Sequence, residues 1–128
     1  MLVCKSCGRV RKYSMKGLII KSPYIELILE GKKKLEIRGS RTNIRGTIGL
    51  IKSGSKKVYG EVKLVGCKEL DLKAYNEYYK GLYGIEKSEL PYKRTYAWVL
   101  EDPVIYKEPK DYNHPLGAVI WVNLDKIG

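Results

Sequence analysis

Short strand-like runs, separated by glycine, serine and proline, set the strongest limit on how this chain can fold. The runs lie at 17–21, 35–38, 46–52, 58–65, 96–100, 104–106 and 116–124. Two other segments, at 22–31 and 71–84, have helical spacing, and they do not alternate regularly with the strands. The sequence therefore predicts an α+β fold that is mainly β, a small β-barrel of about five to six strands with two short helices. An α+β sandwich is the alternative that periodicity leaves open.

The first predicted helix has a start and a stop in the sequence. Ser22 followed by Pro23 predicts the start, because a serine hydroxyl can cap free N–H groups and proline fits the first helical position. Gly31 stands where a left-handed residue ends many helices. The apolar residues at helical spacing, which should face the core, are Tyr24, Leu27 and Ile28.

The second helix and the last strands are also marked by single residues. Asp71 predicts a helix cap, and the helix should end near Gly81 or Gly84. Its apolar face should carry Leu72, Tyr75, Tyr79 and Leu82. Asp102-Pro103 predicts a bulge or a sheet edge, since proline cannot donate to a strand ladder. Residues 116–124 are strongly apolar, which predicts a central strand that is buried on both faces.

The charge of the chain favours an anionic partner. The formal net charge is +11, so the surface should attract polyanions before specific contacts form. Between residues 31 and 57 the only acid is Glu36, and the basic residues are Lys32, Lys33, Lys34, Arg38, Arg41, Arg45, Lys52, Lys56 and Lys57. We expect RNA or a nucleotide as the partner. The alternative is a charge that only supports solubility.

Residues 31–38, with the sequence GKKKLEIR, carry the most informative pattern. In an extended strand Lys34, Glu36 and Arg38 share one face, because alternate side chains lie on the same side. Lys33 lies at the bend between helix and strand, where its amine could reach the same pocket as Glu36. The pattern predicts an ionised acid beside cations, with net positive charge left for a phosphate or a base edge. A solvated charged strand is the alternative.

This stretch resembles the G-x-K-x-x-E-x-R signature of the ASCH family. Gly31, Lys33, Glu36 and Arg38 match its four fixed positions, and stretches at 22–24, 42–50, 58–64 and 96–124 are also similar to the family. The resemblance, over residues 15 to 125, implies a PUA-like β-barrel with a basic cleft that binds RNA, in some cases within a larger RNA-processing or translation-related assembly. We expect this domain to span 15–128, after a basic leader at 1–14 that is free to be flexible.

The resemblance leaves open whether the protein is an enzyme. Some small bacterial members of the family are acetylcytidine amidohydrolases, with a lysine at the position of Lys33, a threonine at the position of Glu36 and a glutamate on a later strand. Glu61 is the candidate for that glutamate. The alternative function is thus an amidohydrolase acting on a modified nucleoside such as acetylcytidine. A ribonuclease in which Glu36 and Glu61 hold a divalent cation is a further alternative.

Three more side chains are candidates for ligand contact. Tyr24 could stack on a base or could be a core tyrosine of the first helix. Arg41 and Arg45 lie in or beside the loop after the signature strand, where they could contact phosphate or remain solvent-exposed. The predicted ligand-binding residues are Tyr24, Lys33, Glu36, Arg38, Arg41 and Arg45.

The cysteines and the apolar runs bear on metals and location. Cys4 and Cys7 form one C-x-x-C pair, which supplies only two of the four ligands of a structural zinc site. They are weak zinc candidates, and we expect no metal or other cofactor. No apolar run approaches the roughly 20 residues that span a bilayer, and the first residues lack the apolar core of a secretory signal. We therefore expect a cytoplasmic protein with no membrane partner.

Overall fold

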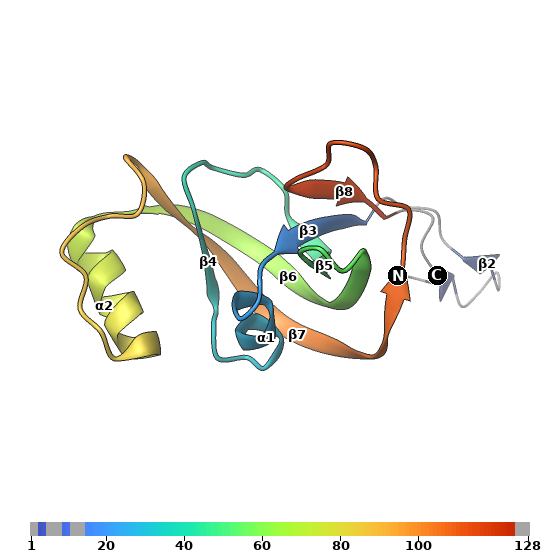
Figure 1. Ribbon diagram of the computed structural model, residues 1–128, viewed down its shortest axis with the longest axis horizontal. Coiled ribbons are helices and arrows are strands. Elements are labelled where there is room, and N and C mark those ends of the chain that lie inside the picture. Colours follow the sequence, from blue (N-terminus) through green and yellow to red (C-terminus); the bar gives the residue numbers. More distant parts are fainter. Residues whose placement is uncertain (1–2, 5–8, 11–14, 125–128) are drawn as a thin grey trace.

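The computed structural model describes residues 3–4, 9–10 and 15–124, with side chains over 15–124. Two very short strands, β1 (Val3–Cys4) and β2 (Arg9–Val10), pair with each other in antiparallel fashion. The remaining elements are β3 (Lys16–Ile20), α1 (Tyr24–Leu29), β4 (Leu35–Arg38), β5 (Gly46–Lys52), β6 (Lys57–Leu70), α2 (Leu72–Tyr83), β7 (Thr95–Asp111) and β8 (Trp121–Asn123). Figure 1 shows their arrangement along the long axis of the molecule.

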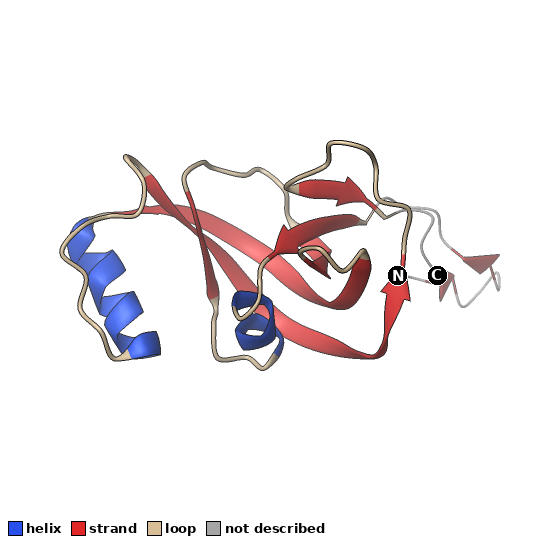
Figure 2. Ribbon diagram, viewed as in Figure 1, coloured by secondary structure: helices blue, strands red, loops and turns tan. Residues whose placement is uncertain are grey.

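One six-stranded mixed sheet forms the body of the protein, in the order β4-β7-β6-β5-β3-β8. β3 and β5 are parallel and the other neighbours are antiparallel. The predicted hairpin of β5 and β6 around residues 53–55 is present. The two helices lie apart from each other, with α2 at one end of the molecule (Figure 2). The predicted mainly β fold with about six strands and two short helices is confirmed.

The long strands β6 and β7 bend where extra residues interrupt their pairing. Glu61 pairs with Val104 while Lys63 pairs with Glu101, so that Asp102 and Pro103 form a bulge. Asp102 has a positive φ of 53°, a conformation that aspartate tolerates better than most residues. The interruption that the sequence predicts at this dipeptide is therefore a bulge inside one continuous strand.

The main core lies between α1 and the concave side of the sheet. Alternate residues of each strand point inward, so the central strands contribute side chains such as Ile48, Leu50, Val62 and Leu64 that are almost fully buried. A second cluster around Met15 and Val58 and a third around Leu70 and Tyr75 extend the core toward the two ends of the sheet.

α1 differs from the prediction in its cap and its buried face. Its N-cap is Pro23, and the Ser22 hydroxyl donates to Glu26 Oε1 at 2.8 Å instead of capping the backbone. Its buried residues are Ile25, Ile28 and Leu29, whereas the predicted Tyr24 is 43% exposed. A six-residue helix has too few residues for periodicity to fix its face, and packing against the sheet selects the aliphatic side.

α2 agrees with the prediction at both ends. Asp71 Oδ1 accepts a hydrogen bond from the Ala74 N–H at 2.8 Å, and Gly84 ends the helix with a left-handed φ of 73°. Of the four residues expected on its buried face, Tyr75 is buried, Tyr79 and Leu82 are partly buried, and Leu72 is exposed. The face thus packs through tyrosine rings.

The prediction of a central, doubly buried strand over 116–124 is wrong. Only Trp121–Asn123 form a strand, β8, and it lies at the edge of the sheet beside β3. Leu116, Val119 and Ile120 are exposed, and Gly117 has a φ of 82° in the turn before the strand. Apolar content suggested burial here, but the turn ends the extended conformation and leaves these side chains outside the core.

Within the described residues, no helix is both long and apolar enough to cross a membrane. The predicted division into a leader at 1–14 and a domain at 15–128 stays a prediction.

Two glycines of β6 offer a matched test of the core. A Cβ at Gly60 would press against the Val104 carbonyl oxygen and lie 2.6 Å from Leu29 Cδ2, whereas a Cβ at Gly66 would meet nothing closer than 3.7 Å. We expect Gly60→Ala to lower the free energy of unfolding by about 1–3 kcal/mol, because α1 and β7 must both move away from β6. Gly66→Ala should change it by less than about 1 kcal/mol. Urea unfolding of both variants checks this, and equal effects would contradict the packing described for Gly60.

Candidate nucleic-acid and nucleotide site

Lys33 is held in place by the tight connection between α1 and β4. Gly31, with a φ of 81°, reverses the chain at the end of α1, and the Lys33 N–H donates to the Leu27 carbonyl at 3.0 Å. The Lys33 side chain is only 5% exposed. Its ammonium donates to the Leu35 carbonyl, to the Tyr78 hydroxyl at 3.1 Å and faces Glu36 Oε1 at 3.4 Å. Three acceptors thus match the three donors of one ammonium.

Burial shifts the ionisation of two groups at this point. Desolvation lowers the pKa of Lys33, and the nearby Glu36 carboxylate opposes that shift. Burial also raises the pKa of Tyr78, which therefore stays a neutral phenol and donates its hydrogen to the Leu35 carbonyl at 3.0 Å. Lys33 and Tyr78 together fix α2 against the start of β4.

Glu36 and Arg38 follow on β4 and extend the ionic network. Glu36 is 8% exposed, and its Oε2 accepts from Arg38 Nε at 2.8 Å. Arg38 Nη2 donates to the Ile19 carbonyl at 3.3 Å, and its guanidinium carbon lies 5.4 Å from the centre of the Trp98 ring. Glu36 pairs with Trp98 across the sheet. Glu36 and Arg38 lie on one face of β4, as predicted. The Glu36 carboxylate therefore reaches Arg38 as well as Lys33.

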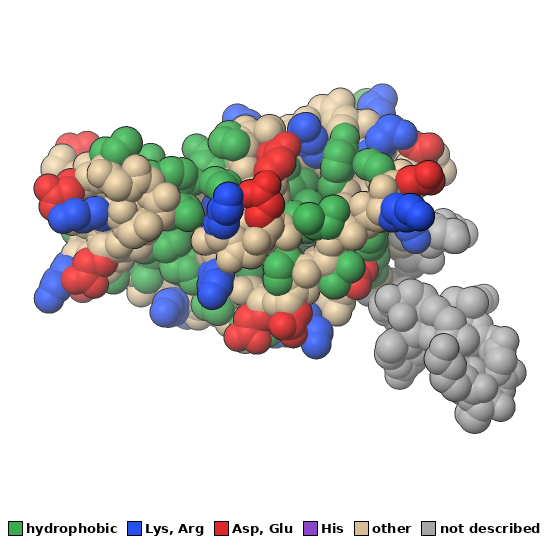
Figure 3. Space-filling model, turned by 90° about the horizontal axis from the view of Figure 1, so that it is seen from below, with side chains coloured by type: hydrophobic (Ala, Val, Ile, Leu, Met, Phe, Trp, Pro, Cys, Tyr) green, Lys and Arg blue, Asp and Glu red, His purple; other side chains and the backbone are tan. Residues whose placement is uncertain are grey.

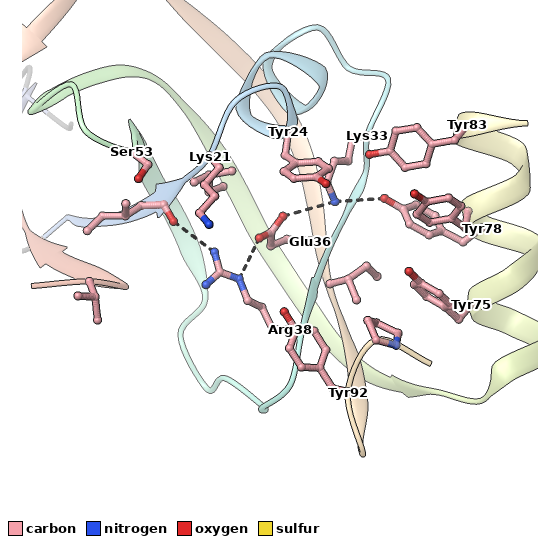
Figure 4. Close-up of a pocket in the computed structure, with 16 residues that line it drawn as sticks. Lys21, Tyr24, Lys33, Glu36, Arg38, Ser53, Tyr75, Tyr78, Tyr83 and Tyr92 are labelled. Atoms are coloured by element: carbon pink, nitrogen blue, oxygen red, sulfur yellow. Dashed lines mark hydrogen bonds and ion pairs between the residues drawn. The ribbon is translucent and has the colours of Figure 1, made fainter. Parts of the chain in front are cut away.

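These residues line a pocket of about 420 Å³, shown in Figure 4. This volume lies within the range of small-molecule sites, about 300–1,000 Å³. The wall combines the ionic network with aromatic and apolar side chains. The lining residues are Ile19, Ile20, Lys21, Tyr24, Lys33, Glu36, Ile37, Arg38, Ser53, Tyr75, Tyr78, Tyr79, Tyr83, Pro91, Tyr92 and Val119.

The structure brings together four of the residues that the sequence singles out, namely Tyr24, Lys33, Glu36 and Arg38. Arg41 lies outside the pocket, with its guanidinium carbon 5.5 Å from the centre of the Tyr96 ring. Arg45 also lies outside it and uses Nη1 to donate to the Thr42 and Ile44 carbonyls, at 2.9 and 2.8 Å. Both arginines remain exposed.

Glu61 is not brought to the pocket either. Its neighbour Val62 points into the main core, so Glu61 projects from the opposite face of β6. There its Oε2 accepts a hydrogen bond from the Tyr106 hydroxyl at 2.8 Å. Its role as a catalytic residue stays a prediction, and the pocket itself provides only Lys33 and Glu36 of that set.

The zinc candidates cannot be placed against this site. The side chain of Cys4 and the whole of Cys7 lie outside the described residues. Over the part of the chain that the structure describes, no group of three or more His, Cys, Asp and Glu side chains could hold a metal ion.

Sequence reasoning missed the aromatic wall and one basic residue. The tyrosines of α2 that line the pocket are Tyr75, Tyr78, Tyr79 and Tyr83. Tyr75 and Tyr79 were expected only as core residues. The signal for a different role was the composition, because a chain with 11 tyrosines and no phenylalanine must give many rings a polar partner. Lys21 and Ser53 reach the pocket from β3 and from the β5–β6 turn, which only the sheet topology brings together.

On the face shown in Figure 3, the positive charge is not spread as one continuous patch. Figure 3 shows one face of the molecule, on which Lys and Arg side chains stand among Asp, Glu and apolar side chains. Ion pairs such as Lys52 with Glu26 and Arg94 with Glu69 reduce the local charge further.

The fold is that of a small PUA-like domain, and its pocket combines cationic side chains with tyrosine rings. The model of the ASCH domain matches residues 18–116, and the chain therefore belongs to the ASCH domain family, which is proposed to bind RNA. Comparison with curated protein sequences gives no match.

Solved structures agree with this assignment. The crystal structure of ASCH from Zymomonas mobilis superposes with a TM-score of 0.55 at 16% identity, over 75% of this chain and 70% of that one. A serine-to-alanine mutant of the Zymomonas mobilis ASCH protein gives a TM-score of 0.57 at 16% identity, over 91% and 92% of the two chains. At this identity the likeness shows the shared fold.

Removal of the Glu36 charge tests whether the network stabilises the fold. We expect Glu36→Gln to lower the free energy of unfolding by about 3 kcal/mol, because the nearly buried Lys33 loses its countercharge. Glu30→Gln is the matched control, since Glu30 pairs with Lys32 at 3.4 Å on an exposed surface and should cost less than about 1 kcal/mol. Chemical unfolding of both variants measures the difference, and equal losses would rule out a stabilising network.

The same variant tests the electrostatic coupling inside the pocket. Burial lowers the pKa of Lys33 and Glu36 raises it, so Glu36→Gln should lower the pKa of Lys33 further. Nitrogen NMR of the lysine ammonium groups can follow this titration, with exposed Lys34 as an internal reference. An unchanged or higher pKa for Lys33 in the variant would contradict the coupling.

Proposed function

We propose that this ASCH domain binds RNA or a nucleotide in the pocket between β4 and α2. The observation that carries the proposal is the convergence of Lys33, Glu36 and Arg38 with six tyrosines, within the described residues, on a single pocket. Tyrosine faces can stack on bases, and each such contact contributes about 1–3 kcal/mol to single-strand binding. Cations beside the rings can donate hydrogen bonds to the phosphates of the same strand.

Tyr24 is placed where it can stack on a ligand ring. The residue is 43% exposed, and its ring centre lies 6.0 Å from the Lys33 ammonium. The contact with the Lys33 ammonium holds one side of the ring in place by a cation–π interaction. An incoming base can therefore cover Tyr24 without disturbing the core.

The amidohydrolase alternative receives less support from the geometry. Such chemistry needs a lysine that can activate a nucleophile and a glutamate that relays protons. The donors of Lys33 are all engaged, and Glu61 lies on the other face of β6. The arrangement suits Lys33 to shaping the pocket as a fixed ammonium.

Binding to single-stranded RNA of mixed sequence tests the proposed function. Fluorescence anisotropy should show an affinity that falls with salt, with a logarithmic slope of about −0.7 for each phosphate neutralised. Tyr24→Ala should weaken binding by about fivefold or more because a stacking contact is lost.

Val104→Ala is the matched control, since Val104 is 50% exposed and lies outside the pocket. Absence of binding to RNA oligonucleotides and mononucleotides, or equal effects of the two substitutions, would refute the proposed function.

A further inference from the structure

The pocket has two chemically different ends. One, which we name the tyrosine end, is formed by Tyr75, Tyr78, Tyr79 and Tyr83 of α2. The other, the cationic end, is formed by Lys21, Arg38 and Ser53. Figure 4 shows these three side chains on one side of Glu36 and the α2 tyrosines on the other.

The cationic end is built on the end of β3. The Ile19 carbonyl accepts from Arg38 Nη2 at 3.3 Å, and the Ile20 carbonyl accepts from the Ser53 N–H at 2.9 Å. Lys21 is the next residue of the chain. The end of β3 thus brings together three donors, from Lys21, from Arg38 of β4 and from Ser53 of the β5–β6 turn. These segments are far apart in the sequence.

The donors of this end are available to a ligand. Among the interactions of residues 15–124, the Lys21 ammonium, the Ser53 hydroxyl and Arg38 Nη1 have no hydrogen-bond or ion-pair partner. Lys33 differs, because its donors are occupied by Leu35, Tyr78 and Glu36. An anion that enters the pocket therefore finds its free donors at the cationic end.

The charge of the pocket fits a dianion. Glu36 pairs with both Lys33 and Arg38, so the three cations Lys33, Arg38 and Lys21 exceed the single carboxylate by two positive charges. A phosphate monoester carries about −1.5 to −2 at neutral pH, whereas an internal phosphodiester of RNA carries a single negative charge. Two cations and a hydroxyl therefore match a terminal phosphate better than an internal one.

We propose that the cationic end binds the terminal phosphate monoester of a nucleotide or RNA strand, while the attached base lies at the tyrosine end. This inference rests on the proposed function and deepens it, because it names the ligand class as phosphorylated ends. It also assigns ligand-binding roles to Lys21 and Ser53.

Matched RNA oligonucleotides test the proposal directly. The probes share one short sequence and carry a 5′-hydroxyl, a 5′-phosphate or a 3′-phosphate, and the mononucleotide pair is adenosine with its 5′-monophosphate. We expect at least one phosphorylated end to bind about tenfold more tightly than the hydroxyl form, since charge-assisted hydrogen bonds are added. The arm that gains affinity identifies which end is recognised.

Variants of the cationic end separate this inference from general binding. Lys21→Ala and Ser53→Ala should each reduce the preference for the phosphorylated probe over the hydroxyl probe several-fold. Lys107→Ala, at an exposed position outside the pocket, is the control for loss of charge. Lys21 and Ser53 are exposed, so thermal unfolding should be unchanged and should confirm that both variants fold.

The outcomes distinguish the two proposals. If phosphorylated and hydroxyl probes bind equally while Tyr24→Ala still weakens both, the terminal-phosphate inference fails and the pocket remains the binding site. If the phosphate preference persists unchanged in Lys21→Ala and Ser53→Ala, the cationic end is not its source and the inference fails. If no probe binds, both the inference and the proposed function fail.

Discussion

The ionic contacts of one buried ammonium organise this protein. Lys33 sits in a nearly water-free position where an unpaired charge would cost several kcal/mol. It is tolerated because the Leu35 carbonyl, the Tyr78 hydroxyl and the Glu36 carboxylate surround it. These partners come from β4 and α2, so the requirement to satisfy one charge joins the sheet edge to the second helix. Arg38 extends the network toward β3 through the Ile19 carbonyl.

This arrangement also separates structural from ligand-facing charge. The Lys33 ammonium donates to groups of the protein itself, and Glu36 places one carboxylate oxygen against Lys33 and the other against Arg38. The positive charge that faces the cavity is then carried by Arg38 and by Lys21, which stands at the end of β3. The pocket therefore has a cationic end and a tyrosine end of distinct chemistry, which lie on opposite sides of Glu36.

The fold could be predicted to a large extent from local patterns. Alternation predicted β4, and the turn at 53–55 between two strand-like runs predicted β5 and β6. The Asp71 cap and Gly84 bounded α2, and Asp102-Pro103 marked the bulge of β7. The failures share a cause. The face of α1 and the exposure of residues 116–120 depend on what packs against them, and neither a six-residue helix nor an apolar run contains that information.

For the site, the sequence determined the chemistry of β4. Glu36 and Arg38 are two residues apart and share a strand face, and Lys33 lies at the bend just before that strand. It could not determine that Arg41, Arg45 and Glu61 stay outside the pocket, since that depends on loop path and strand face. Nor could it supply Lys21, Ser53 or the tyrosines of α2. These residues meet β4 only because parallel pairing of β3 with β5 and docking of α2 bring distant segments together, which is a property of tertiary structure.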